Sequence, residues 1–133
     1  MILSLPFLIL SLIAYNAIVF MTGTPFDTII FQVPMMSGAM WTFTLSDLIV
    51  AGTLFLLFIE ILKATRTSGN SLVDHALSTI VFIICIIEFL VVPEAATSLF
   101  FFITLITLID VIAGFSVTIR AARRDFAVGP QSF

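Results

Sequence analysis

The feature that most constrains this chain is an apolar run from Ser98 to Arg124 that is long enough to cross a membrane. The run carries one carboxylate, Asp110, in its middle and ends in three arginines, Arg120, Arg123 and Arg124. About 20 apolar residues, at ~1.5 Å each along a helix, cross a hydrocarbon layer of ~30 Å. The run therefore predicts a transmembrane helix, and Asp110 is the residue within it that needs an explanation.

Composition extends this prediction to the whole chain. Of its 133 residues, 61% are hydrophobic and 10% are charged, whereas a soluble domain has roughly 45–50% apolar and 25% charged residues. A soluble fold of this size has too little interior to hide so much apolar surface. We expect a single integral membrane domain over residues 1–133. Basic residues occur only at the ends of the apolar runs, which argues against nucleic acid as a partner.

Local signals divide the chain into four spans. Thr22-Gly23-Thr24-Pro25 ends the first, and Thr44-Leu45-Ser46-Asp47 opens the second as a capping box. Pro93 ends the third, and Pro93 to Ala96 is expected to form the first turn of the fourth. The first residues lack the basic region and cleavage site of a signal peptide, so a retained span is expected. We predict an all-α, four-transmembrane-helix bundle in up-down order, with spans at about 2–21, 45–65, 72–92 and 97–122.

The loop of residues 25–45 is the one sizeable connection. Two β-prone pieces, Ile29–Val33 and Ala39–Phe43, flank the turn-rich pentamer Pro34–Gly38. These pieces predict a short outer hairpin lying on the membrane face, with a short interfacial helix as the alternative. Trp41, the one tryptophan, stands where an interfacial aromatic anchor is expected.

The basic residues predict the orientation of the spans. All five follow either the second span or the fourth, and the 22–45 loop and the Pro93 turn have none. Because cytoplasmic loops are enriched in lysine and arginine, both termini are expected to be cytoplasmic. The arginines of the fourth span lie at its end and do not recur through its middle, so they resemble anchors, with weak contact to anionic lipids, rather than a voltage sensor. The topology anchors are Lys63, Arg66, Arg120, Arg123 and Arg124.

Three segments carry a resemblance to known proteins. Ile61–Thr67, Val73–Ser78 and Ala113–Asp125 resemble a group of small four-span inner-membrane proteins of alphaproteobacteria. The resemblance implies a bacterial inner membrane. No activity is attached to that group, so no functional residue follows from it.

Counting residues from the oriented ends predicts an inner polar layer. Glu60 lies 13 residues after Asp47, and Asp110 lies 12 residues after Ser98, so both are ~18–20 Å from the outer ends of their spans. Lys63 and His75 are placed near the same level. Two carboxylates at one depth can form a proton or cation site. The alternative is structural: Glu60 pairs with Lys63 one turn on, and Asp110 is protonated or bonds Thr104, Thr107 or a neighbouring helix.

Other polar residues have simpler interpretations. A second, outer layer is predicted from Asn16, Tyr15 and Glu88. Asp47, Asp74 and Glu94 suit helix starts, Cys85 suits the core, and His75 suits the inner interface. No metal motif, haem ligand pair or other cofactor site is indicated. The small residues Gly114, Thr118 and Ala122 recur every fourth position and predict a helix-packing face, either within the chain or toward another subunit.

These observations favour a non-enzymatic role. No phosphate loop, nucleophile-base set or zinc-protease motif is present. We expect an accessory or assembly subunit of an inner-membrane complex, or a small homo-oligomer, whose partners are the lipid bilayer and other membrane subunits or copies of itself. The alternative is a small proton or cation channel, or a proton-coupled transporter, that uses Glu60 and Asp110. A lytic pore-former is a third and weaker option.

Overall fold

The computed structural model describes residues 5–65 and 71–128, except for the side chains of Ser71, Thr118 and residues 120–128. Within these residues, three helices are long and apolar enough to cross a membrane, at Leu45–Ala64, Leu72–Val91 and Ser98–Val117. The elements in chain order are α1 (Ile9–Ala17), the π-helix η2 (Ile18–Thr22), β1 (Ile29–Pro34), β2 (Met40–Thr44), α2 (Leu45–Ala64), α3 (Ser71–Val91), the 3-10 helix η3 (Pro93–Ala95) and α4 (Ser98–Val128).

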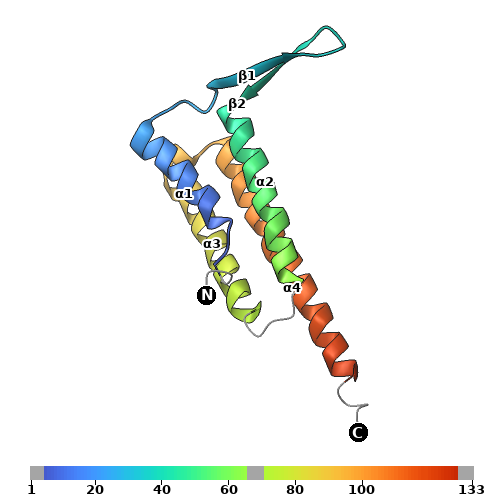
Figure 1. Ribbon diagram of the computed structural model, residues 1–133. Coiled ribbons are helices and arrows are strands. Elements are labelled where there is room, and N and C mark those ends of the chain that lie inside the picture. The colour runs from blue at the N-terminus through green and yellow to red at the C-terminus, as the bar shows by residue number, and fades with distance from the viewer. Residues whose placement is uncertain (1–4, 66–70, 129–133) are drawn as a thin grey trace.

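The helix α4 is the centre of the assembly. It packs along both α2 and α3, while α1 contacts α2 and α4 near one end (Figure 1). In the same view α2 and α4 run in one direction, and α1 and α3 run in the other. With 31 residues, α4 is about 46 Å long, and its last turns project beyond the end of α2.

The first helix is shorter than the predicted span of residues 2–21. The α-helix begins only at Ile9, after tight turns in which Ile9 N–H bonds the Pro6 carbonyl at 3.1 Å. Pro6 has no N–H and disfavours the helical conformation in the residue before it. A helix therefore cannot run through Leu5. The other end agrees with the prediction, because Gly23 adopts φ 66° and closes the π-helix with a bond to the Ile18 carbonyl.

The predicted start of α2 is confirmed. The Thr44 hydroxyl accepts from the Asp47 N–H at 3.3 Å, and the Asp47 carboxylate accepts from the Thr44 N–H at 3.1 Å. This reciprocal pair satisfies two backbone donors that the helix start would leave free.

The expectation that Pro93 opens the fourth span is wrong. Pro93–Ala95 form a separate 3-10 turn, and the chain leaves helical geometry at Ala96 (φ −83°, ψ 63°). The helix α4 begins after this break, where the Thr97 hydroxyl accepts from the Phe100 N–H at 3.1 Å. Thr97 is therefore the residue that caps α4, and the proline serves the turn between α3 and α4.

The outer loop forms the predicted hairpin and not an interfacial helix. The strands β1 and β2 pair antiparallel around a turn in which Gly38 adopts φ 92°. The hairpin extends away from the N-terminal end of α2, to the side of the bundle and at a steep angle to the helices (Figure 1).

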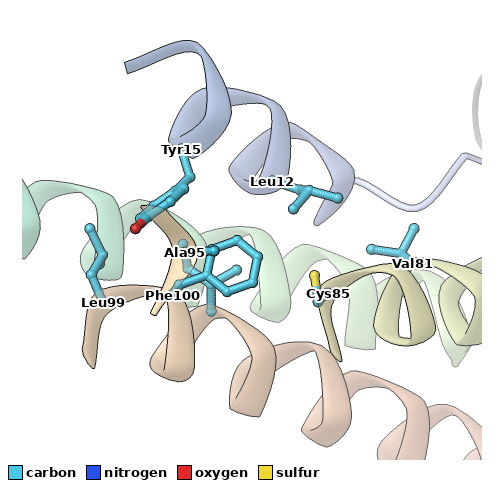
Figure 2. Packing of buried hydrophobic residues seen from close by; sticks show 8 residues of the cluster. Leu12, Tyr15, Val81, Cys85, Ala95, Leu99 and Phe100 are labelled. Atoms are coloured by element: carbon cyan, nitrogen blue, oxygen red, sulfur yellow. The ribbon is translucent and has the colours of Figure 1, made fainter. Parts of the chain in front are cut away.

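The half of the bundle next to the hairpin is held by an apolar core. Tyr15 and Leu12 of α1 point toward Phe100 of α4 and toward Val81 and Cys85 of α3 (Figure 2). Tyr15 is fully buried, and its hydroxyl donates to the Glu94 carbonyl at 2.9 Å. Cys85 is also fully buried, as its predicted core position requires. The cluster comprises Leu12, Tyr15, Val81, Cys85, Ala95, Leu99, Phe100 and Ile103.

Candidate functional site

A polar cluster lies at the opposite end of the bundle from the hairpin. Glu60 and Asp110 are almost fully buried there, with 2% and 6% of their surfaces exposed. The two carboxylates are close enough to repel each other, so the structure brings the two acids of the predicted inner layer together. We use the name inner cluster for six side chains at this end of the bundle: Glu60, Lys63, Asp74, His75, Ser78 and Asp110.

Glu60 is bound to the start of the chain as well as to its own helix. Its Oε1 atom accepts from the backbone N–H of Phe7 and from Lys63 Nζ at 3.1 Å. The Phe7 N–H belongs to the turn that precedes α1, where no helical carbonyl is available to accept it. Glu60 therefore caps the first helix from a neighbouring one.

Lys63 joins three segments of the chain. Its Nζ atom donates to the Leu5 carbonyl at 2.6 Å and lies 3.6 Å from Asp74 Oδ1 at the start of α3. It also lies 4.2 Å from the centre of the Phe7 ring, within cation–π range. Among the side chains that the structure describes, Lys63 is the one lysine or arginine. Its predicted pairing with Glu60 is thus only one of several contacts.

His75 is buried between α3 and α4, near the start of α3. Its ring is 8% exposed and packs edge-on against Phe115 with ring centres 4.0 Å apart. A Cβ atom at Gly114 would lie 2.7 Å from His75 Nδ1. Gly114 therefore makes room for an imidazole of α3, and not for close approach of α2. Thr118 and Ala122, the other predicted members of this face, have side chains outside the described residues.

Asp110 is held by α3 and not by the threonines of its own helix. The Ser78 side chain of α3 lies beside its carboxylate. Thr104 and Thr107 instead donate to carbonyls of α4, at 2.9 Å to Phe100 O and 2.6 Å to Thr104 O. Of the structural alternatives, the contact with a neighbouring helix is the one observed.

Of the three residues predicted to form the outer layer, two are hydrogen-bonded to each other. Asn16 Nδ2 donates to Glu88 Oε1 at 3.2 Å, across the boundary between α1 and α3. Tyr15 is not part of it, because its hydroxyl points to Glu94 and Thr97. The pair lines an open groove whose other walls are apolar, and within the described chain Glu88 Oε2 is buried without a hydrogen-bond partner. The remaining groove residues are Phe20, Ile84, Ile87, Val91 and Val92.

Sequence reasoning missed two members of the inner cluster. Asp74 lies in the first turn of α3, as expected of a helix-start residue, but its contact with Lys63 and the role of Ser78 are not predicted by the sequence. Their spacing of four residues places them on one face of α3, and that spacing was available as a signal. The backbone groups of Leu5 and Phe7 had no such signal.

Some predicted residues cannot be compared with the structure. Arg66 lies outside the described residues, as do the side chains of Arg120, Arg123 and Arg124. In the portion of the chain that is described, no three histidine, cysteine or acidic side chains gather as metal ligands would.

We predict unequal effects of two substitutions at Glu60. Glu60→Ala leaves the buried Phe7 N–H without an acceptor, while Lys63 keeps the Leu5 carbonyl and Asp74, so the variant should lose about 1–3 kcal/mol of stability. Glu60→Gln keeps an acceptor oxygen and should cost clearly less. Unfolding of the detergent-solubilised protein measures both, and faster amide exchange at Phe7 in Glu60→Ala alone would locate the loss. Equal losses in the two variants would contradict the capping role.

A second prediction concerns the notch at Gly114. Gly114→Ala should destabilise the protein by about 1–3 kcal/mol, because the added methyl group collides with the His75 ring. The double variant Gly114→Ala/His75→Ala should recover much of this loss, as a non-additive thermal-stability cycle would show. Gly52→Ala, where a Cβ meets nothing within 4 Å, is the matched control. Additive losses in the double variant would mean that the clash is not the cause.

Comparisons with known proteins add no identification. No protein-family model, curated protein or solved structure matches this chain. The resemblance to four-span inner-membrane proteins therefore stays a prediction, and the functional argument depends on the geometry of the chain itself.

Proposed function

We propose that this chain is a non-enzymatic, multi-pass inner-membrane protein that acts as an accessory or assembly subunit of a membrane complex, or as a small homo-oligomer. The observation that carries the proposal is the groove between α1 and α3. There the buried Glu88 Oε2 has no partner among the described residues, beside its bonded neighbour Asn16. A groove with apolar walls around a hydrogen-bonded asparagine–glutamate pair favours association with a partner helix.

The shape of the groove supports the same proposal. Its walls include Ile84 and Ile87 of α3, which are about half exposed, and Phe20 at the end of the first helix. Apolar walls around a few polar atoms are what a partner helix with one polar side chain requires. The inner carboxylate Glu60, in contrast, already has its donors within the chain.

The proposal includes four crossings with both termini cytoplasmic. Leu5 and Phe7 contact the C-terminal part of α2, which puts residues 5–7 at the proposed cytoplasmic end of the bundle. The helical stretch Ile9–Thr22 covers only about 21 Å. Residues 5–8 complete the crossing, and side chains of α2 satisfy their backbone groups, as a non-helical segment at membrane depth requires.

The groove is tested by photo-crosslinking in native membranes. A photoreactive amino acid at Ile87, in the groove, should give a discrete protein adduct, whereas one at Phe58 should give none. Ile87 and Phe58 are similarly exposed, at 56% and 59%, but Phe58 lies outside the groove on α2. Glu88→Ala should reduce the yield of the Ile87 adduct roughly three- to tenfold, since such a membrane hydrogen bond is worth about 1–2 kcal/mol. Lipid adducts alone from Ile87, or the same protein adduct from Phe58, would refute the proposal.

A second function, a proton or cation pathway, has one specific observation in its favour. Asp110 is buried beside Glu60 and Ser78. Lys63 forms its two ion pairs with Glu60 and Asp74 and not with Asp110. Buried acids within membrane helices often mark ion or proton routes.

Flux measurements in proteoliposomes distinguish this alternative. If the chain conducts protons or cations, Asp110→Asn and Glu60→Gln should abolish the flux, while Asp47→Asn at the start of α2 should leave it intact. Asp110→Asn is the more decisive variant, because Asp110 bonds no backbone group among the described residues, whereas Glu60 does. Flux that is absent from the wild type, or unchanged in both variants, would eliminate the pathway.

A further inference from the structure

The hairpin of β1 and β2 has two chemically different faces. Phe31 pairs with Phe43 and Val33 pairs with Trp41, and the three aromatic rings contact one another with centres 4.7–5.6 Å apart. Side chains alternate along a strand, so the intervening residues lie on the opposite face. There Gln32 pairs with Thr42, and their side chains are hydrogen-bonded at 3.4 Å. We call the side of Phe31, Val33, Trp41 and Phe43 the aromatic face.

No described part of the protein covers the aromatic face. Every residue of β1 is exposed, and Trp41 of β2 is 46% exposed. The sheet has only two strands, so both of its edges are open. A two-stranded hairpin is marginal in water on its own, and exposed apolar edge strands invite aggregation. The hairpin therefore requires a surrounding medium that accepts its aromatic rings.

The charge pattern identifies that medium. From Thr28 to Ser46 the chain has no acidic, basic or histidine residue, and Asp27 and Asp47 stand immediately outside this stretch. A segment without charge pays no charge-desolvation cost on entering the headgroup region of a membrane. Tryptophan and other aromatic side chains are enriched at this level.

The backbone excludes the deeper alternative. The open edges of both strands carry N–H and C=O groups without partners in the sheet, and such groups are not tolerated in the hydrocarbon layer. The second strand of the hairpin also runs directly into the capping box of α2, where a membrane helix reaches its polar boundary. It then turns to the side of the bundle, so it lies above the lipid next to α2 and not above the helices (Figure 1).

We propose that the hairpin is a membrane-interface element whose aromatic face rests on the lipid headgroup region of the outer leaflet, beside the bundle. The proposal depends on the membrane location of the helices and not on the groove or on partner binding, so each can fail without the other. Since the stretch is uncharged, its contact with lipid should not depend on anionic headgroups or on salt.

The single tryptophan makes the proposal directly measurable. Trp41 is the only tryptophan of the chain, so the fluorescence of the whole protein in phosphatidylcholine vesicles reports on the aromatic face. We expect a blue-shifted emission and strong quenching by lipids brominated near the glycerol, with weaker quenching by lipids brominated near the chain ends. Acrylamide in the water should quench Trp41 several-fold less than it quenches a free tryptophan amide.

Two neighbouring substitutions form a matched test. Val33→Glu puts a charge on the aromatic face, and Gln32→Glu puts the same charge on the opposite face of the same strand. Val33→Glu should remove most of the quenching by brominated lipid and increase that by acrylamide, whereas Gln32→Glu should leave both near wild type. Far-UV circular dichroism checks that the helices persist in each variant.

The outcomes divide clearly. A wild-type Trp41 that emits as in water, with acrylamide quenching and no quenching by brominated lipid, would overturn the proposal and leave the face to a protein partner. Deep quenching, strongest near the chain ends, would overturn it as well, because it would place the open strand edges in the hydrocarbon layer. Equal effects of Val33→Glu and Gln32→Glu would remove the role of the aromatic face.

Discussion

The contact between Glu60 and the backbone of Phe7 is the constraint on which the inner half of this protein depends. Pro6 interrupts helical geometry before Ile9, so the Leu5 carbonyl and the Phe7 N–H lie outside the hydrogen-bond pattern of the first helix. A buried backbone group that finds no partner costs about 1–3 kcal/mol. Glu60 and Lys63 supply the missing acceptor and donor. This explains why an acid and a base stand one turn apart near the inner end of α2.

The two halves of the bundle are consequently stabilised by different forces. The outer half is an apolar core in which the Tyr15 hydroxyl finds a carbonyl and a threonine. In the inner half, polar contacts join α2 to α3 through Lys63 and Asp74, and α3 to α4 through Ser78 and Asp110. His75 fills the notch at Gly114 between these contacts. The central position of α4 allows both halves to close around a single helix.

This division bears on the choice between assembly and transport. Glu60 is engaged by the chain itself, and much of the inner cluster is therefore explained by the need to hold four segments together. Glu88 is different, because it lies in the wall of an apolar groove and one of its oxygens is buried with no donor among the described residues. Asp110 lies between these cases, with a hydroxyl neighbour and a second carboxylate nearby. The surplus of polar capacity at Glu88 is what favours a partner helix over a sealed monomer.

The sequence by itself determined the features that depend on local chemistry. The three long apolar helices, the capping box of Thr44 and Asp47, the helix end at Gly23 and the hairpin of residues 29–44 all follow from neighbouring residues. Depth counting also placed Glu60 and Asp110 in one layer, because helical rise is constant. Errors arose where a local signal had two outcomes. Pro93 serves a turn before α4 and not its first turn, and Pro6 was overlooked as a stop to the first helix.

Only the tertiary structure decided which polar groups meet. The Glu60 contact joins residues 53 positions apart, and the Asn16–Glu88 bond joins residues 72 apart. Periodicity gives the depth of a side chain and its angular position on its own helix, but not the rotation of that helix toward its neighbours. That rotation results from packing all the helices at once. For this reason no sequence signal indicated that Gly114 accommodates His75, or that Asp110 lies against Ser78 of α3.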